Sequence, residues 1–184
     1  MPDWPRPFSN CYWVEPGRLL AGEYPGAPAA DQARHKLRAL LLAGLTDFVD
    51  LTEADEPLRP YAELLQTEAA SLGLAVTHTR LAVPDMGVPA AAAQMTRILD
   101  TLDHALAAGR RAYVHCWGGV GRTGTVVGCY LVRRGAAGDT ALAQIAAWWR
   151  TVPKSAWHPA SPETAAQRAY VRGWREPAPR ADPG

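Results

Sequence analysis

The stretch from His115 to Thr123, which reads His-Cys-Trp-Gly-Gly-Val-Gly-Arg-Thr, restricts the fold more than any other part of the chain. A β-prone run at 111–114 precedes it, and an apolar run of helical spacing follows to Arg134, with Gly135 at its end. The stretch is therefore predicted to be a loop between a strand and a helix. Its three glycines allow successive N–H groups to turn toward one anion, and the helix N-terminus adds its positive dipole end.

Two side chains of this loop, Cys116 and Arg122, give it chemistry. The N–H groups and the helix dipole favour the thiolate of Cys116, which is the nucleophilic form of cysteine. Arg122 can hold two phosphoryl oxygens at once, which fixes the phosphorus for in-line attack and neutralises charge in the transition state. The predicted phosphate-binding residues are Cys116, Trp117, Gly118, Gly119, Val120, Gly121 and Arg122.

The two ends of the stretch have predicted catalytic roles that compete with structural ones. Thr123 is placed to offer its hydroxyl to the sulfur when Cys116 leaves, but a threonine at a helix start also caps helices, and the sequence does not separate the two. His115 is expected to hydrogen-bond backbone carbonyls and to hold the loop in shape; the alternative is a histidine that is merely packed at a strand end.

The whole stretch is far more specific than the spacing of cysteine and arginine alone. With three cysteines and seventeen arginines in the chain, a Cys-x5-Arg pair arises by chance about one time in four, whereas the added His, Thr and glycines lower this to roughly one in ten thousand. The stretch resembles the signature loop of the protein tyrosine phosphatase superfamily, and most closely that of its small dual-specificity-like members. The resemblance implies a cysteine-dependent phosphatase.

A second segment, Leu81–Pro89, resembles the mobile general-acid loop of the same superfamily and lies about thirty residues before the cysteine, as in its smaller members. Asp85 is the predicted acid, because the leaving oxygen of a phosphomonoester must be protonated and the resulting carboxylate can later activate water. Taken by itself, the Pro-Asp-x-Gly sequence favours the competing interpretation, in which Asp85 is a turn residue between Pro84 and Gly87. Beside the Cys116 loop, we favour catalysis.

The segment 161–170 resembles the part of the family that carries water-positioning glutamines, and Gln167 matches one of them. Glu163 stands where the family usually has glutamine, which leaves the handling of the hydrolytic water open. The competing interpretation, which the sequence favours, is a helix capped by Ser161 with Pro162 in its first turn.

The resemblance covers residues 11 to 175, and 16–25 is similar to the family's opening strand. It implies hydrolysis of phosphotyrosine in proteins or peptides, with phosphoserine and phosphothreonine as further substrates, through a cysteinyl-phosphate intermediate. Two alternatives stay open. One is an inositol phosphate or phosphoinositide phosphatase, which 117–121 does not favour because it lacks a further lysine or arginine. The other is a phosphate-binding module without turnover.

The periodicity predicts an α/β fold, with a central, mostly parallel sheet of four to five strands flanked by helices, as in cysteine phosphatases. The predicted strands lie near 18–21, 46–51, 74–82 and 111–115, and the predicted helices near 29–43, 57–72, 89–108, 122–135, 139–150 and 163–174. We expect residues 1–184 to form a single phosphatase domain, with a core at 11–175 and proline-rich tails at both ends.

Three loops, the third at 52–57, are expected at the carboxyl ends of the strands, where ligands gather in such sheets. The acidic residues of the third loop are Glu53, Asp55 and Glu56. One interpretation is that they shape substrate choice; we favour the other, that they complement a helix dipole, and do not count them as catalytic residues.

The composition of the chain limits the classes of partner and cofactor that are expected. A formal net charge of +1 gives no reason to expect nucleic acid or an acidic membrane as a partner. The scattered histidines and the lack of a second cysteine at a ligand spacing predict no metal, and the chemistry needs no cofactor. Cys11 and Cys129 are expected to be buried apolar residues, or protective disulfide partners of an oxidised Cys116 if they lie near it. We expect a cytoplasmic monomer.

Overall fold

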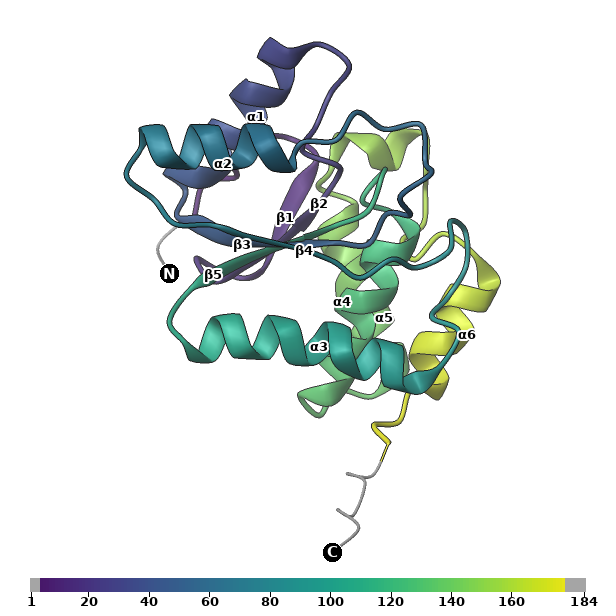
Figure 1. Ribbon diagram of the computed structural model, residues 1–184. Helices are drawn as coiled ribbons and strands as arrows, with labels where there is room; N and C mark the ends of the chain where they lie inside the picture. The colour runs from purple at the N-terminus through teal and green to yellow at the C-terminus, as the bar shows by residue number, and fades with distance from the viewer. Residues whose placement is uncertain (1–3, 178–184) are drawn as a thin grey trace, which may run out of the picture.

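The central sheet of the computed structural model, which describes residues 4–177, has five strands in the order β1-β2-β5-β3-β4 (Figure 1). The strands are β1 (Cys11–Glu15), β2 (Leu19–Gly22), β3 (Leu45–Asp50), β4 (Thr77–Arg80) and β5 (Arg111–His115). β1 pairs with β2 in antiparallel fashion, whereas the other neighbouring pairs are parallel. The predicted α/β fold with a mostly parallel sheet is confirmed.

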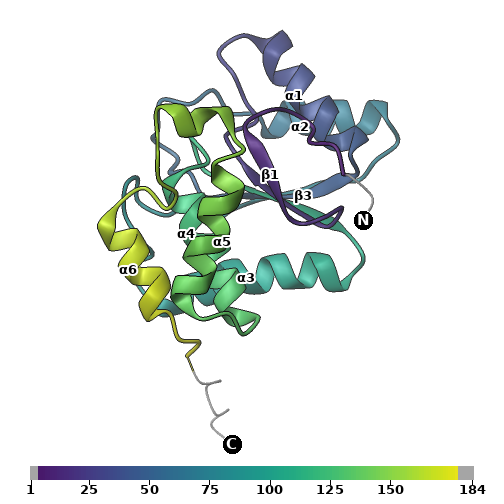
Figure 2. The same ribbon diagram turned by 180° about the vertical axis from the view of Figure 1, so that it is seen from behind.

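Helices cover both faces of the sheet, as the two opposite views show (Figures 1 and 2). On one face lie α1 (Ala30–Leu42) and α2 (Ala62–Ser71). The other face carries α3 (Ala92–Ala107), α4 (Gly121–Arg133), α5 (Gly138–Trp149) and α6 (Ala165–Gly173). A short 3₁₀ turn, η1 (Pro153–Ala156), follows α5.

The strand predicted near 18–21 is β2, but it is the second strand of the chain and not the opening one. The first strand is β1, and 16–25 holds the turn after it and then β2. The register between β1 and β2 shifts between Trp13 and Glu15. Cys11 and Tyr12 are neighbours and both buried, so β1 lacks the regular alternation of polar and apolar residues that identifies a strand.

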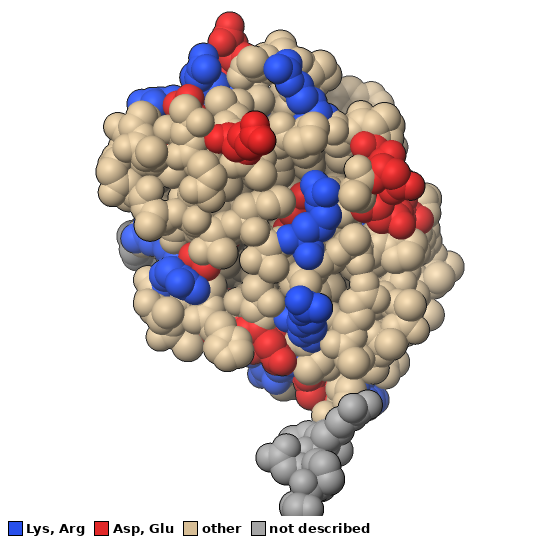
Figure 3. All heavy atoms as spheres, in the orientation of Figure 1, with Lys and Arg blue, Asp and Glu red and all other residues tan. Residues whose placement is uncertain are grey.

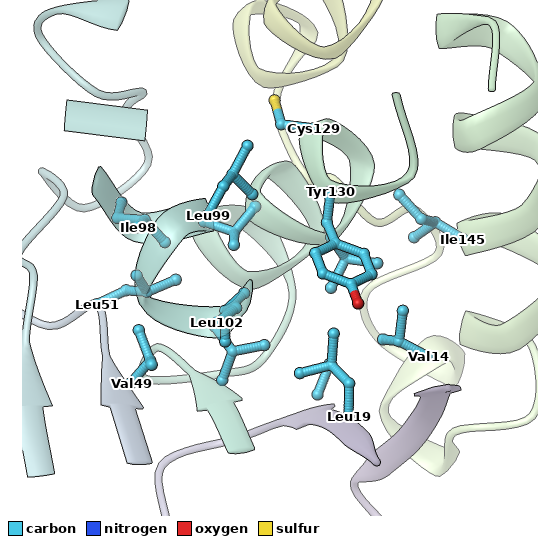
Figure 4. Close-up of a cluster of buried hydrophobic side chains, with 14 of the residues drawn as sticks. Val14, Leu19, Val49, Leu51, Ile98, Leu99, Leu102, Cys129, Tyr130 and Ile145 are labelled. Carbon is cyan, nitrogen blue, oxygen red and sulfur yellow. The ribbon is translucent and has the colours of Figure 1, made fainter. Parts of the chain in front are cut away.

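The inner strands β2, β5 and β3 are buried on both faces, because helices cover both sides of the parallel sheet, whereas the edge strand β4 is partly exposed. In β5, Ala112 and Val114 belong to the core on the side of α3 and α4, whereas Tyr113 belongs to the core beside α1 and α2. Figure 4 shows the first of these cores, where side chains of α3, α4 and α5 meet those of the strands. Burial of each large apolar side chain stabilises the fold by about 1.5–3 kcal/mol.

The parallel strands β3, β4 and β5 bring their carboxyl ends to one edge of the sheet. The loops that leave this edge are 51–61 after β3, 81–91 after β4 and 116–120 after β5. The topology therefore places the three predicted loops on one rim.

Of the predicted tails, residues 1–3 and 178–184 lie outside the described part of the chain, and 4–7 form neither helix nor strand. Trp4 nevertheless packs on the body, with its ring centroid 6.0 Å from that of Trp13 and 5.0 Å from the Arg111 guanidinium carbon. No helix within 4–177 has the length and apolar character to cross a membrane. Acidic and basic side chains are interspersed on the face shown in Figure 3.

Candidate active site

The loop that carries Cys116 joins β5, which has a strand on either side, to the start of α4. Gly119 has a φ of 75°, and a Cβ there would lie 2.5 Å from the backbone carbon of Gly22, so only glycine fits. Among the backbone hydrogen bonds of residues 4–177, none is donated by the amides of 117–120. These amides and the N-terminus of α4 are therefore available to an anion.

A hollow of about 320 Å³ opens above this loop. Its lining combines the loop, the 81–91 segment and the region from η1 to α6. The lining residues are Asp85, Met86, Cys116, Trp117, Gly118, Val120, Gly121, Arg122, Lys154, His158, Glu163 and Gln167. Cys116 is 3% exposed, so its sulfur lies at the floor of the hollow rather than on the open surface. We call this hollow the catalytic pocket.

Arg122 is almost completely buried, and four protein groups hold its guanidinium in place. Its Nη1 donates to the carbonyl oxygens of Leu51, at 3.3 Å, and Val83, at 3.1 Å. The Glu56 carboxylate accepts from both guanidinium ends, at 2.5 Å and 3.0 Å. The Asp85 carboxylate lies 2.9 Å from Nη2. The guanidinium is thereby held at one orientation in the pocket, as bidentate recognition of a phosphoryl group requires.

The interpretation of Glu53 and Glu56 as helix-dipole residues was wrong, because α2 begins only at Ala62. Glu56 instead orients Arg122, and Glu53 accepts a hydrogen bond from the backbone N–H of Asp85 at 3.1 Å. Burial raises the pKa of Glu56, but the hydrogen bonds from Arg122 and Glu53 outweigh it and leave the pKa below its usual range. Glu53 and Glu56 are thus two site residues that the sequence did not identify. The available signal was the position of their loop on the same rim as the Cys116 and Asp85 loops.

His115 is fully buried beneath the loop. Its Nδ1 lies 3.2 Å from the carbonyl oxygen of Cys116, and its Nε2 lies 2.7 Å from the hydroxyl of Tyr61. The contact with a backbone carbonyl is the one expected of a residue that shapes the loop. Burial lowers the pKa of His115 to about 4, so the ring is neutral at physiological pH.

Asp50 lies at the carboxyl end of β3, beside the buried His115, and has no exposed surface. Its carboxylate accepts from the Thr52 hydroxyl at 2.6 Å and lies 3.1 Å from Nε2 of His78 and 3.2 Å from Arg80. Burial raises the pKa of Asp50, but the hydrogen bonds from His78 and Thr52 lower it further than burial raises it. The 51–61 loop is therefore tied to β4 through one ionised carboxylate.

The neutral state of His115 gives the first testable result. Its pKa is about 4 in the fold and about 6.5 in an unfolded chain, so protons bind preferentially to the unfolded state as the pH falls from 6.5 to 4. We expect wild type to lose on the order of 2–3 kcal/mol more stability than His115→Gln between pH 7 and pH 4.5. Urea unfolding at both pH values measures this difference; equal losses in the two proteins would refute the buried neutral state.

Thr123 is fully buried, and its hydroxyl has no hydrogen-bond partner among the described residues. The N-cap of α4 is Val120, which makes no side-chain capping bond, so Thr123 does not cap the helix. Of its two expected roles, the hydroxyl remains available for the one that serves the sulfur of Cys116.

The N-cap of α6 is Thr164, not the predicted Ser161, whose hydroxyl donates instead to the carbonyl oxygen of Val120 at 2.7 Å. Gln167 forms a capping box with Thr164 and donates from Nε2 to the carbonyl oxygen of Gly87 at 3.0 Å. The capped-helix interpretation is right in kind and wrong in position. Gln167 also lines the pocket, so it joins α6 to the loop of Asp85.

Removal of this cap has a measurable cost. We expect Thr164→Ala to lower the free energy of unfolding by about 1 kcal/mol, because the backbone N–H of Gln167 loses its acceptor. Chemical denaturation measures the change, with Thr164→Ser as the matched control that keeps the hydroxyl. A loss of equal size in both variants would contradict the capping role.

Two further pocket residues, Lys154 and His158, come from a region without a recognisable motif. Lys154 of η1 donates to the carbonyl oxygen of Gly118 at 3.2 Å. His158 lies 3.3 Å from the carboxylate of Glu163, which therefore has a partner other than a hydrolytic water. Trp117, which belongs to the Cys116 loop, is 45% exposed and lines the pocket wall. Sequence reasoning assigned no site role to Lys154 or His158.

The other cysteines are buried, as expected, and all three thiols are free. Cys11 lies opposite Gly22, which lies opposite His115, so about 10 Å, two strand spacings, separates Cys11 from the end of β5. Cys129 lies eight residues into α4, about 12 Å along the helix from Gly121. Both separations exceed the roughly 7 Å Cα limit for a disulfide. The arrangement argues against direct pairing with Cys116.

The chain is similar to known proteins over most of its length. A family model described as Swiss Army Knife protein, DSP-PTPase phosphatase domain, matches residues 8–175. The chain has the fold of Tk-PTP in its active form, at 24% identity and a TM-score of 0.62, over 89% of this chain and 94% of that one.

Two further solved structures share the fold. PTPMT1 in complex with PI(5)P is 19% identical, with a TM-score of 0.64 over 92% of this chain and 93% of that one. TpbA of P. aeruginosa in complex with pTyr is 20% identical, with a TM-score of 0.62 over 94% of this chain and 90% of that one.

Proposed function

The chain belongs to the family of Swiss Army Knife protein, DSP-PTPase phosphatase domains, and from this premise we propose that it hydrolyses phosphotyrosine in proteins through a cysteinyl-phosphate intermediate. Phosphoserine and phosphothreonine are proposed as further substrates. The observation that carries the proposal is the convergence of Cys116, Arg122 and Asp85 in one pocket. We further propose that residues 1–184 act as a single-domain, cytoplasmic monomer.

In the first step, the thiolate of Cys116 attacks the phosphorus in line, an S–P bond forms and the bond to the leaving oxygen breaks. Asp85 gives its proton to that oxygen, so the product leaves as a neutral alcohol or phenol. In the second step, water attacks the cysteinyl phosphate, the Asp85 carboxylate takes a proton from it, and the S–P bond breaks. The free Thr123 hydroxyl then donates to the departing sulfur.

The contact between Asp85 and Arg122 describes the site before substrate binds. Asp85 is half-exposed, and its carboxylate lies on Nη2 of Arg122. An incoming phosphoryl group also needs this guanidinium. The carbonyl contacts lie on Nη1 and the buried Glu56 carboxylate spans Nη1 and Nη2, so the half-exposed Asp85 is the partner that can be displaced. We infer that the phosphate displaces Asp85 from Arg122, which releases the carboxyl group to face the leaving oxygen.

Asp85→Asn is expected to lower kcat about 10²–10³-fold on a phosphotyrosine peptide near neutral pH, because the amide cannot protonate the leaving oxygen. The loss should be several-fold smaller on p-nitrophenyl phosphate, whose leaving group needs less protonation. Steady-state kinetics on both substrates measure the two losses. Asp55→Asn, on the neighbouring loop, is the matched control and should retain wild-type rates; equal losses on both substrates would contradict the acid role.

The proposal is tested by hydrolysis of a phosphotyrosine and a phosphothreonine peptide with EDTA present. Acid quenching during turnover, followed by mass spectrometry, should find one phosphate on the peptide that contains Cys116. If both the wild type and a variant with a slowed second step turn over substrate but neither carries this phosphate on Cys116, the intermediate does not form. Binding without any turnover would support the phosphate-binding module instead.

A second candidate, a phosphoinositide phosphatase, is favoured by one observation. The 117–121 loop lacks further cations, but the fold brings Lys154 from the η1 region into the pocket. A cation there suits a substrate with several phosphates. A kcat/KM on inositol polyphosphates at least about tenfold above that on phosphotyrosine peptides would favour this candidate over the first.

A further inference from the structure

A second hollow, of about 230 Å³, adjoins the catalytic pocket and shares Trp117 and Lys154 with it. Its other walls come from 23–28, 57–59 and Lys36. We call it the side pocket. The mechanism above makes no use of it.

The side pocket is positively charged. Its charged lining residues are Lys36, Arg59, Lys154 and Glu23, and three cations against one carboxylate leave a net charge of +2. The Glu23 carboxylate forms ion pairs with Lys36 and with Lys154, whose Nζ lies 2.6 Å from Oε2. Burial raises the pKa of Glu23, but the hydrogen bonds from the two lysines lower it below its usual range, so the carboxylate stays ionised.

Glu23 therefore works as a holder for the two lysines rather than as a competing anion on the surface. Its side chain is 11% exposed, whereas those of Lys36 and Lys154 are 27% and 28% exposed. Arg59 is exposed at the rim, and its Nη1 donates to the carbonyl oxygen of Pro28 at 2.9 Å. The cations remain partly open to a ligand.

We propose that the side pocket binds a second anionic group of the substrate, an aspartate or glutamate side chain that flanks the phosphotyrosine of the target protein. This inference rests on the proposed function. Trp117 is a wall common to both hollows, so a group that enters the side pocket must pass its ring, which suits a side chain on an extended peptide. Tyr24, Pro57 and Leu58 supply apolar surface for its methylene groups.

The experiment uses phosphotyrosine peptides in which a single aspartate is moved through positions −3 to +3 of an otherwise uncharged sequence. One position should raise the wild-type kcat/KM about 5–30-fold over the peptide without aspartate, as expected for a charge-assisted hydrogen bond at a partly exposed site. The gain should appear in KM. Arg59→Gln should reduce it to less than about twofold, and Arg59→Lys should restore part of it.

Two controls separate this role from a structural one. Arg97→Gln, on an exposed position of α3 at the other face of the sheet, should keep the full gain. All variants should hydrolyse p-nitrophenyl phosphate at wild-type rates, because that substrate has no second anionic group.

The proposal is overturned if no position of the aspartate alters the wild-type kcat/KM, or if the gain persists in Arg59→Gln. It is also overturned if Arg59→Gln impairs the hydrolysis of inositol bisphosphates but not that of the peptides, since the pocket would then serve a phosphoinositide headgroup. If wild type hydrolyses none of the peptides, the proposed function itself fails, and the inference fails with it. Turnover of peptides without a preference defeats the inference alone.

Discussion

Cys116→Ser is expected to lower kcat on a phosphotyrosine peptide by at least about 10⁴-fold, the largest effect of any single substitution in this chain. Serine has nearly the same size, but its hydroxyl does not ionise near neutral pH and is a far weaker nucleophile. The sulfur lies at the floor of the catalytic pocket, where no other cysteine can reach the phosphorus. Affinity for the peptide should be retained, because Arg122 and the loop amides stay in place.

Cys11→Ser is the matched control. The Cys11 thiol donates to the carbonyl oxygen of Phe8 at 3.0 Å, and a hydroxyl can make the same bond, so this variant should fold and keep its rate. Single-turnover kinetics and fluorescence binding measure both quantities for both variants. A Cys116→Ser protein that retains more than about one hundredth of the wild-type rate would exclude the thiolate mechanism.

Arg122→Lys is expected to lower kcat/KM about 10³-fold. An arginine that stabilises a phosphoryl transition state contributes about 10³–10⁵-fold to the rate, and lysine keeps the charge but not the planar fork. A single ammonium cannot satisfy both carboxylate oxygens of Glu56 and two phosphoryl oxygens together. The loss should therefore exceed what the charge alone explains.

Glu56→Gln separates the orientation of Arg122 from its charge. An amide can still accept one hydrogen bond from the guanidinium, so we expect a loss of only about 10-fold in kcat/KM, with unchanged stability to within about 1 kcal/mol. In the variant that combines Glu56→Gln with Arg122→Lys, the loss in kcat/KM should be smaller than the product of the two single losses, because both substitutions disturb one contact. Full additivity would show that Glu56 does not act through Arg122.

The sequence identified the parts of the site that are continuous in the chain. The loop from His115 to Thr123 carries its chemistry within nine residues, and the strand before it and the helix after it follow from local periodicity. Asp85 could be predicted because its loop resembles the general-acid loop of the superfamily, and it lines the same pocket as Cys116. The parallel sheet then places both loops on one edge.

The missing parts depend on contacts between distant segments. Glu56 meets Arg122 across 66 positions of the chain, and the start of α2 at Ala62 cannot be read from acidic residues that suit a helix N-terminus equally well. The cap of α6 shifted from Ser161 to Thr164 because the Ser161 hydroxyl is taken by the Val120 carbonyl. In each case a tertiary partner decided between two locally acceptable structures.

The pairing of Glu23 with Lys36 and Lys154 has a practical consequence for anyone who handles this protein. These are the only two lysines in the sequence, so apart from the N-terminus every amine available for acylation, biotinylation or cross-linking belongs to one carboxylate beside the pockets. Amine-reactive labels would change the charge of the site wall rather than decorate a neutral surface. Attachment to a surface through groups other than cysteine thiols and lysine amines leaves the site unmodified, so the activity measured is that of the native site.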